Sequence, residues 1–229
     1  MSPRPLALVT GSTRGVGAAT ARALSATHDL LLGGRDTDAL RALAAELPGA
    51  TPWAAELTDD HAMAQATASI TRLDVLVHAA GVARVATLES TSAQQWRATM
   101  DVNVVAVAEL TRLLLPALRA ARGHVVLINS GAGLRANPGW GAYAASKFAL
   151  RALADTLRAE EEANGIRVTS VHPGRIDTDM QRQVRADEGG AYDASQYLTA
   201  QTVAGAVLTA IQAPADAHLT EVVLRPAVR

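Results

Sequence analysis

Three side chains in the middle of the chain, Ser130, Tyr143 and Lys147, could together move a proton. Ser130 lies in VVLINSGAG and the other two in YAASK, so on a helix the phenol and the ammonium share one face, a turn apart. A phenol titrates near pH ~10, too high for efficient proton exchange at neutral pH. At an effective dielectric of ~20, an ammonium ~4 Å away would favour the phenolate by up to roughly 4 kcal/mol before solvation costs, so a fall of about two in the phenol pKa is expected. The pattern predicts Tyr143 as the acid or base, with the Ser130 hydroxyl holding a substrate oxygen.

The Tyr-x-x-x-Lys spacing alone also occurs on ordinary amphipathic helices. In this chain a glycine-rich turn near the N-terminus accompanies it. An apolar run from Leu6 to Val9 precedes the turn, and an alanine-rich helical pattern from Ala18 to Leu24 follows it. Glycines allow close backbone approach, and a helix N-terminus offers free N–H groups and a positive dipole end, so this arrangement predicts a diphosphate site. The spacing is GxxxGxG, so the common GxGxxG dinucleotide fingerprint fits only loosely. The candidate binding residues are Gly11, Ser12, Thr13, Arg14, Gly15, Val16 and Gly17.

The elements that must position these residues alternate along the whole chain. Strands are expected at Ala7–Val9, Asp29–Leu32, Thr51–Ala54, Val75–His78, Val125–Ile128, Arg167–Val171 and Glu221–Leu224. Helical patterns lie near residues 15–25, 37–46, 59–70, 95–121, 143–163 and 202–212. The strand runs lack polar alternation, as expected of strands covered on both faces. We therefore predict one α/β domain over residues 1–229, a Rossmann-like doubly wound parallel sheet of about seven strands with helices on both faces.

The combination of motifs resembles the short-chain dehydrogenase/reductase family, in its compact branch. That family carries TGxxxGxG, an NAG-like motif after the fourth strand, an Asn in the next helix, then Ser, YxxxK and a PG motif. The matching residues, in the same order and with thirteen residues from the serine to the tyrosine, are Thr10 to Gly17, His78-Ala79-Ala80-Gly81, Asn103, Ser130, Tyr143, Lys147 and Pro173-Gly174. The resemblance runs from about Leu6 to Leu224. It implies an oxidoreductase that transfers a hydride between NADP(H) and a carbonyl or secondary alcohol.

The resemblance also implies roles for individual residues. Ser130, Tyr143, Lys147 and Asn103 form the implied catalytic set: Lys147 also binds the nucleotide ribose, and Asn103 holds a water linked to Lys147. Implied contacts with adenine, ribose and nicotinamide lie at Glu56, Leu57, Ala79, Ala80, Gly81, Pro173, Gly174, Ile176 and Thr178. Glu56 replaces the family's Asp, and Ala79 replaces its Asn. His78 is expected to be a buried, hydrogen-bonded histidine rather than a base. No metal is expected, because the six histidines show no ligand spacing.

The end of the second expected strand bears on the choice between NAD and NADP. That position meets the adenosine ribose, where an acid favours NAD and an arginine clamps the 2′-phosphate of NADP. Relatives that favour NAD usually carry Asp at the position of Gly34; here Arg35 follows this glycine, and Arg14 lies in the glycine turn. Asp36 is the competing signal, but it is expected to cap the next helix. The sequence favours NADP.

Substrate selectivity is expected to come from two less regular segments. Residues 180–200 combine two adjacent glycines with mixed charge, which predicts a mobile loop with at most a short helix, and the resemblance makes this segment a lid over the substrate. Candidate pocket residues are Arg135, Asn137, Trp140, Arg182, Tyr192 and Tyr197. Either Arg135 or Arg182 could hold a carboxylate, or neither could. The segment TEVVLRP (220–226) looks like relatives that act on small hydroxy acids, hydroxy amino acids or simple carbonyls, without separating these substrates.

Composition limits the range of partners. The chain has 229 residues, 49% of them hydrophobic, no cysteine and a formal charge of −1, which gives no reason to expect a nucleic acid or an anionic membrane as partner. No secretory signal or membrane span is apparent, so a cytoplasmic protein is expected. Family analogy predicts a homodimer or homotetramer that pairs through the helices at 95–121 and 143–163. Two alternatives remain: a non-catalytic NADP(H)-binding regulator on the same fold, and a lyase or epimerase that uses a bound nucleotide transiently.

Overall fold

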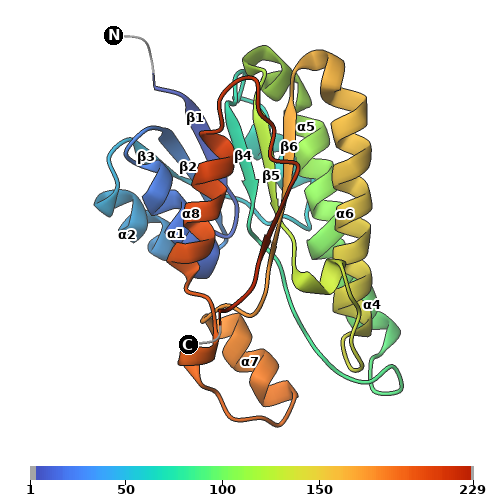
Figure 1. Ribbon diagram of the computed structural model, residues 1–229. Coiled ribbons are helices and arrows are strands. Elements are labelled where there is room, and N and C mark those ends of the chain that lie inside the picture. Colours follow the sequence, from blue (N-terminus) through green and yellow to red (C-terminus); the bar gives the residue numbers. More distant parts are fainter. Residues whose placement is uncertain (1–3, 228–229) are drawn as a thin grey trace.

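The computed structural model describes residues 4–227, and within them seven strands form one parallel sheet in the order β3-β2-β1-β4-β5-β6-β7 (Figure 1). The strands are β1 Leu6–Val9, β2 Asp29–Gly34, β3 Ala50–Ala54, β4 Val75–His78, β5 His124–Ile128, β6 Arg167–Pro173 and β7 Glu221–Leu224. Every expected strand is present, with ends that move by two residues at most. The order of the strands reverses between β1 and β4, which confirms the doubly wound sheet.

The helices of the described residues follow the strands in alternation. They are α1 Gly15–Leu24, α2 Thr37–Glu46, α3 Asp60–Thr67, α4 Ala93–Met100, α5 Ala106–Ala121, α6 Gly141–Glu161, α7 Asp179–Asp187 and α8 Ala200–Ile211. The helical pattern expected near 95–121 is present as continuous helical backbone, in which a π-helical turn at Asp101–Val105 divides α4 from α5. The expected lid segment begins with the nine-residue helix α7, which starts where the Thr178 hydroxyl accepts a hydrogen bond from the N–H of Gln181. Thr178 is the N-cap of α7, a signal for the start of a helix that the sequence analysis did not use.

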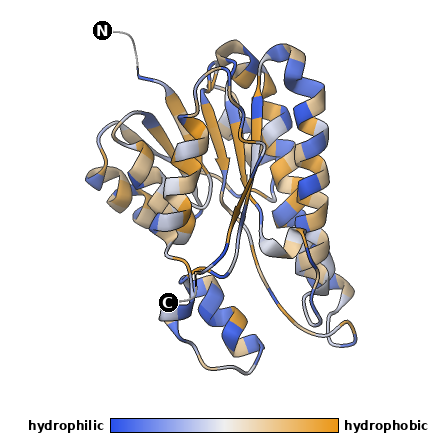
Figure 2. Cartoon of the chain, viewed as in Figure 1, coloured by the Kyte–Doolittle hydropathy of each residue, from blue (hydrophilic) through white to orange (hydrophobic). Residues whose placement is uncertain are grey.

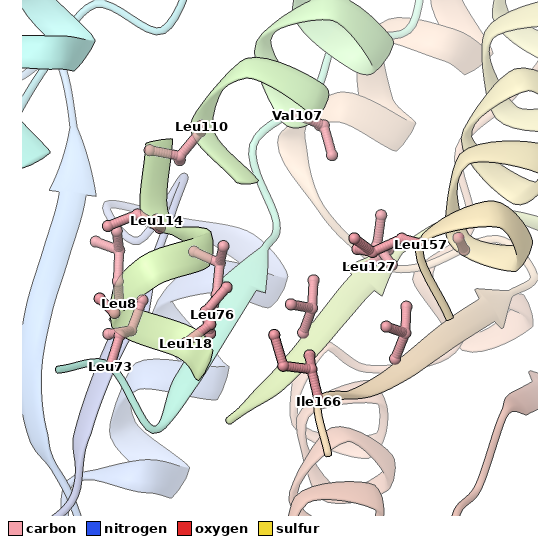
Figure 3. Packing of buried hydrophobic residues seen from close by; sticks show 14 of the residues in the cluster. Leu8, Leu73, Leu76, Val107, Leu110, Leu114, Leu118, Leu127, Leu157 and Ile166 are labelled. Carbon is pink, nitrogen blue, oxygen red and sulfur yellow. The ribbon is translucent and has the colours of Figure 1, made fainter. Parts of the chain in front are cut away.

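Two hydrophobic layers hold the helices against the sheet, because successive residues of a covered strand point to opposite faces. On β1, Ala7 and Val9 join the cluster that contains side chains of α1, α2 and α8. Leu8, between them, joins the opposite cluster with side chains of α3, α5 and α6. Figure 3 shows this second cluster, in which Leu110 and Leu114 of α5 lie above the strands. The uninterrupted apolar runs of the sequence therefore reflect burial on both sides.

Hydrophobicity is distributed as this layering requires (Figure 2). The central strands are hydrophobic along their length, whereas the outward faces of the covering helices carry hydrophilic residues. Helix α7 lies below the carboxyl ends of the strands, away from both layers, and is mostly hydrophilic. Because all the strands are parallel, the segments that follow β1, β4, β5 and β6 meet at this one edge of the sheet. These segments contain the residues that the sequence singled out.

Candidate active site

A cleft of about 600 Å³ lies at the carboxyl edge of the sheet. Every residue predicted to be catalytic or to bind the cofactor lines this cleft, except Ser12 and Asn103. The Ser12 side chain is fully buried below the glycine turn and donates a hydrogen bond to the carbonyl of Gly33 at 3.1 Å, so it supports the turn from behind. Val102, the neighbour of Asn103, reaches the cleft instead. The topology therefore brings together predicted residues from the carboxyl ends of six strands, β1 to β6.

The glycine turn has the shape that a diphosphate requires. Gly11 has a φ of +64°, and a Cβ there would lie 2.8 Å from the Cα of Ala80. A Cβ on Gly17 would lie 2.2 Å from the carbonyl oxygen of Gly11, so only glycine lets helix α1 begin so close to the turn. Arg14 precedes α1, and its side chain makes no capping hydrogen bond to the first N–H groups of the helix. The turn thus fits a nucleotide diphosphate, with open backbone at the positive end of a helix dipole.

The turn after β4 is held by Thr10, which the sequence placed in the glycine motif but not among the candidate binding residues. The hydroxyl oxygen of Thr10 accepts hydrogen bonds from the N–H groups of Ala79 and Ala80, each at 3.1 Å. This buried threonine thus links the end of β1 to the turn after β4, at the point where the strand order reverses. His78 is fully buried and its Nε2 lies 2.9 Å from the Thr111 hydroxyl, with its pKa lowered to about 3 by burial. The expectation of a buried, hydrogen-bonded histidine is confirmed.

Tyr143 and Lys147 lie one turn apart on α6, as their spacing predicts, and Ser130 follows β5 across the cleft. The lysine Nζ is 5.8 Å from the centre of the tyrosine ring. The expected lowering of the phenol pKa by this ammonium is wrong for the structure: burial raises the pKa of Tyr143, and a hydrogen bond with Ser130 lowers it in part. Sequence spacing gave the proximity of the two groups but could not give the desolvation, which acts in the opposite direction on the phenol.

Lys147 is a buried cation. Its Nζ donates a hydrogen bond to the carbonyl of Ile128 at 2.9 Å, at the end of β5. Burial lowers the pKa of its ammonium to about 8. The lysine is thus held against the same strand end that leads into Ser130, and its charge is available to an acceptor in the cleft.

Asn103 lies in the π-helical turn between α4 and α5 and is buried, with a relative exposure of 1%. Its Oδ1 accepts a hydrogen bond from the N–H of Val82, and its Nδ2 donates to the Val82 carbonyl and to the Ser146 hydroxyl. A Cβ on Gly81 would lie 3.1 Å from Asn103 Oδ1 and 4.0 Å from Lys147 Nζ. The asparagine therefore ties the loop after β4 to helix α6 directly behind the lysine.

The far end of the cleft carries an arginine beside a carboxylate. Arg35 NH1 lies 3.4 Å from Glu56 Oε2, and the arginine side chain is 77% exposed. Glu56 also accepts hydrogen bonds from the hydroxyl and N–H of Thr58, and these contacts lower its carboxyl pKa. Asp36 accepts a hydrogen bond from the N–H of Ala39 at 3.0 Å and so caps α2, as expected. The acid that competed with Arg35 in the sequence is thus engaged in a helix cap.

The opposite end of the cleft contains both expected and unexpected side chains. Of the six candidate pocket residues, Arg135, Asn137 and Trp140 line it. Arg182 does not: its guanidinium stacks over the Tyr192 ring at 4.3 Å and pairs with Asp177. Tyr192 donates a hydrogen bond to the same Asp177 carboxylate, and neither Tyr192 nor Tyr197 reaches the cleft. Arg182, Tyr192 and Asp177 together hold the segment after α7 against the start of that helix.

Sequence reasoning missed several side chains at this end, namely Asn129, Arg175, Met180, Gln181, Val184 and Arg225. Arg175 immediately follows the PG motif, and Arg225 lies in the TEVVLRP segment, so their positions in recognised motifs were the available signal. Within residues 4–227, no three His, Asp or Glu side chains gather closely enough to hold a metal ion. None of the helices in that range has both the length and the hydrophobicity that crossing a bilayer requires.

Comparison with known proteins agrees with this geometry. The family model for short chain dehydrogenase matches residues 5–189. Glycine betaine reductase ATRR of Emericella nidulans is 33% identical over 96% of this chain, which spans 18% of that longer protein. Dehydrogenase/reductase SDR family member 11 of Gallus gallus is 32% identical, over 96% of this chain and 95% of the other. The alcohol dehydrogenase of Thermococcus sibiricus complexed with 5-hydroxy-NADP has a TM-score of 0.89 and 26% identity, over 98% of this chain and 97% of the other. The chain therefore belongs to the short-chain dehydrogenase family of oxidoreductases.

Proposed function

We propose that this oxidoreductase interconverts a carbonyl compound and its secondary alcohol with NADP(H), and that Tyr143 is its general acid and base. The observation that carries the proposal is the convergence of Ser130, Tyr143 and Lys147 on one cleft whose other end is the glycine turn. The turn, Lys147 and the loop after β6 would hold the dinucleotide, which supplies a hydride when bound. The protein's own task is then to bind the carbonyl, polarise it and deliver one proton.

Ser130 and Tyr143 bind the carbonyl oxygen by donating hydrogen bonds to it as negative charge develops there. Tyr143 gives its proton to that oxygen and recovers one afterwards. Because burial raises the phenol pKa, the free tyrosine is held protonated and ready to donate. The Lys147 ammonium, held by the Ile128 carbonyl, stabilises the phenolate that forms after donation, and Asn103 holds the loop after β4 against helix α6. In the direction of oxidation the same groups act in reverse.

NADP is the proposed cofactor, rather than NAD. Arg14 and Arg35 both line the glycine-turn end of the cleft, and Asp36 is occupied as the cap of α2. A guanidinium can bind a 2′-phosphate through paired charge-assisted hydrogen bonds, whereas NADH offers only a hydroxyl there. The complex of the Thermococcus sibiricus relative with 5-hydroxy-NADP is in line with this preference.

The cofactor preference is tested by calorimetric titration of the protein with NADPH and with NADH. We expect NADPH to bind more tightly, and Arg35→Ala to weaken NADPH about 10- to 100-fold while leaving NADH nearly unchanged. Arg14→Ala should produce a smaller loss. Equal affinity for the two nucleotides in the wild-type protein would refute the phosphate clamp.

Residues 180–200 are proposed to form the substrate lid, with α7 as its ordered part. Met180, Gln181 and Val184 of this helix face the cleft, while the segment behind them is held by Arg182, Tyr192 and Asp177. Closing α7 on the cleft would exclude water from the reacting atoms.

The catalytic proposal is tested with Tyr143→Phe, which removes only the acidic hydroxyl. In a panel of aldehydes and ketones followed by NADPH absorbance, we expect turnover to fall by about 10²- to 10⁴-fold, with the NADPH dissociation constant within a few fold of wild type. Thr67→Ala, which removes one buried hydroxyl on α3 outside the cleft, is the matched control. A non-catalytic NADP(H)-binding regulator predicts instead that the wild-type protein turns over nothing and that Tyr143→Phe retains its action.

A further inference from the structure

Three arginines line the substrate end of the cleft, and they differ in how their charge is used. Arg175 forms a two-pronged ion pair with Glu188, with N···O distances of 2.7 and 2.8 Å. Its guanidinium also lies 5.5 Å from the centre of the Trp140 ring. The charge of Arg175 is therefore neutralised by the lid helix, and its planar edge is occupied. Arg135 and Arg225 are the two that remain.

Arg225 presents a free edge beside the catalytic loop. Its NH1 donates to the carbonyls of His172 and Leu224, at 3.1 and 2.9 Å. Among residues 4–227, no acceptor binds its Nε or NH2 and no carboxylate pairs with it. A guanidinium held through one nitrogen keeps the Nε–NH2 edge, which matches the two oxygens of a carboxylate. The two hydrogen bonds of NH1 hold the guanidinium in place, while Nε and NH2 stay unpaired among the described residues.

The position of Arg225 depends on a glycine next to Ser130. A Cβ on Gly131 would lie 3.3 Å from both NH1 and NH2 of the arginine. The missing side chain thus lets the guanidinium pack against the residue that follows the carbonyl-binding serine. An anion held there would lie beside the loop that carries Ser130, in the same cleft as Tyr143.

Acidic groups along the cleft do not cancel this charge. The cleft is lined by two carboxylates, Glu56 and Asp179. Glu56 pairs with Arg35 at the nucleotide end. Asp179 lies in the first turn of α7, where the helix dipole stabilises its carboxylate. Arg135 forms no side-chain hydrogen bond or ion pair with any residue in 4–227. The substrate end therefore carries excess positive charge and unused N–H donors.

We propose that the physiological substrate is a small oxo acid, or the corresponding hydroxy acid, whose carboxylate binds the free edge of Arg225 with Arg135 as a second positive charge. This inference rests on the proposed reductase function and deepens it. In the reduction, the carbonyl carbon gains the hydride of NADPH, the electron pair of the C=O bond moves to oxygen, and Tyr143 protonates that oxygen. A hydroxy acid and NADP⁺ result, and the carboxylate itself is unchanged.

The test compares each acid with its neutral ester in one enzyme preparation. Reduction of 2-oxobutanoate and 3-oxobutanoate is measured beside that of their methyl esters, in the wild type and in Arg225→Met, Arg225→Lys and Arg41→Met. The ratio of kcat/KM for acid over ester does not depend on the fraction of folded enzyme, so a partly destabilised variant remains informative. We expect the ratio to favour at least one acid and to fall about 10- to 100-fold in Arg225→Met, the loss of a charge-assisted pair.

The lysine variant should lie between, since it keeps the charge and loses the fork. Arg41→Met removes an exposed arginine on α2, outside the cleft, and should leave the ratio unchanged. Preference for the esters, or an equal loss for acid and ester in Arg225→Met, would overturn the carboxylate site. So would a weakening of NADPH binding that accounts for the whole loss.

A binding measurement separates this inference from the proposed function. NADP⁺-loaded protein is titrated calorimetrically with oxamate and malonamate and with their neutral ethyl esters. Binding of an acid that requires Arg225, in a protein that reduces no carbonyl compound, supports the anion site and overturns the reductase. Turnover of neutral carbonyls without acid preference, together with no binding of either acid, overturns the anion site and leaves the reductase standing.

Discussion

Replacing Lys147 by methionine should make the protein more stable while abolishing its proposed activity. Burial lowers the pKa of this ammonium from 10.5 to about 8. At about 1.4 kcal/mol per pKa unit, holding the charged form in the folded protein costs about 3 kcal/mol near neutral pH. Methionine of similar length removes that cost and also removes the hydrogen bond to the Ile128 carbonyl, which contributes about 1 kcal/mol. We therefore expect the free energy of unfolding to rise by about 2 kcal/mol at about pH 7.

The sign of the pH dependence follows from the lowered pKa. Between about pH 8 and 10.5 the unfolded chain holds the Lys147 proton while the folded protein has released it, so wild-type stability rises with pH across this window. Below about pH 8 both states are protonated and the full cost is present. The advantage of Lys147→Met should thus be greatest near neutral pH and should shrink as the pH rises towards 10.

Two measurements check this reasoning. Urea unfolding of nucleotide-free protein at about pH 7 and about pH 9.5 gives the stability difference, with Arg41→Met as a surface control expected to change it by less than about 0.5 kcal/mol. Lys147 is the single lysine in the chain, so protein labelled with ¹³C-lysine gives one side-chain NMR signal whose titration reports its pKa directly. A pKa at or above 10.5, or a methionine variant less stable than wild type at neutral pH, would refute the burial cost.

Four further substitutions test other parts of the molecule. Gly17→Ala should destabilise the protein by about 3 kcal/mol or more, because the new methyl group would meet the carbonyl of Gly11. Gly205→Ala, in helix α8 with open space around it, should instead stabilise by up to about 1 kcal/mol, and urea unfolding compares the two. Glu56→Gln frees the arginine it pairs with and should tighten NADPH binding about two- to fivefold by calorimetry, without tightening NADH. Phe148→Glu should reduce the size of the expected homodimer or homotetramer in light scattering, because this 41%-exposed phenylalanine lies on α6; an unchanged mass would place the contact elsewhere.

The layered fold could be predicted from sequence because each strand carries its own signal. A run such as Val125–Ile128 is apolar throughout, which is typical of a strand covered on both faces, and both of its faces are buried in the structure. The helical pattern at 95–121 did not reveal the π-helical turn at Asp101–Val105, because the hydrophobic pattern continues through that turn. One extra residue per turn shifts the register of a helix without leaving a local mark in residue types. Contacts of Asn103 with Val82 and Ser146, far away in the chain, accompany that turn.

The candidate site likewise has features that the sequence predicted and features that only the tertiary structure shows. Its order along the chain could be read from motifs, since a parallel sheet brings successive strand ends to one edge. The TEVVLRP segment marked Arg225, but its place in the site depends on a contact with Gly131 that joins the last strand to the loop after β5. Arg182 looked equivalent to Arg135 in the sequence, yet Tyr192 and Asp177 hold it away from the cleft.

By itself, the sequence determined what depends on a few neighbouring residues: the glycine turn ahead of α1, the one-turn spacing of Tyr143 and Lys147, and the Asp36 cap. Those features are set by backbone sterics and short-range hydrogen bonds, which any fold must satisfy locally. Only the tertiary structure decided the protonation of the site, because desolvation is imposed by segments distant in the chain. Desolvation raises the pKa of Tyr143 and lowers that of Lys147. It therefore favours a protonated phenol beside an ammonium group that gives up its proton more readily than an exposed lysine.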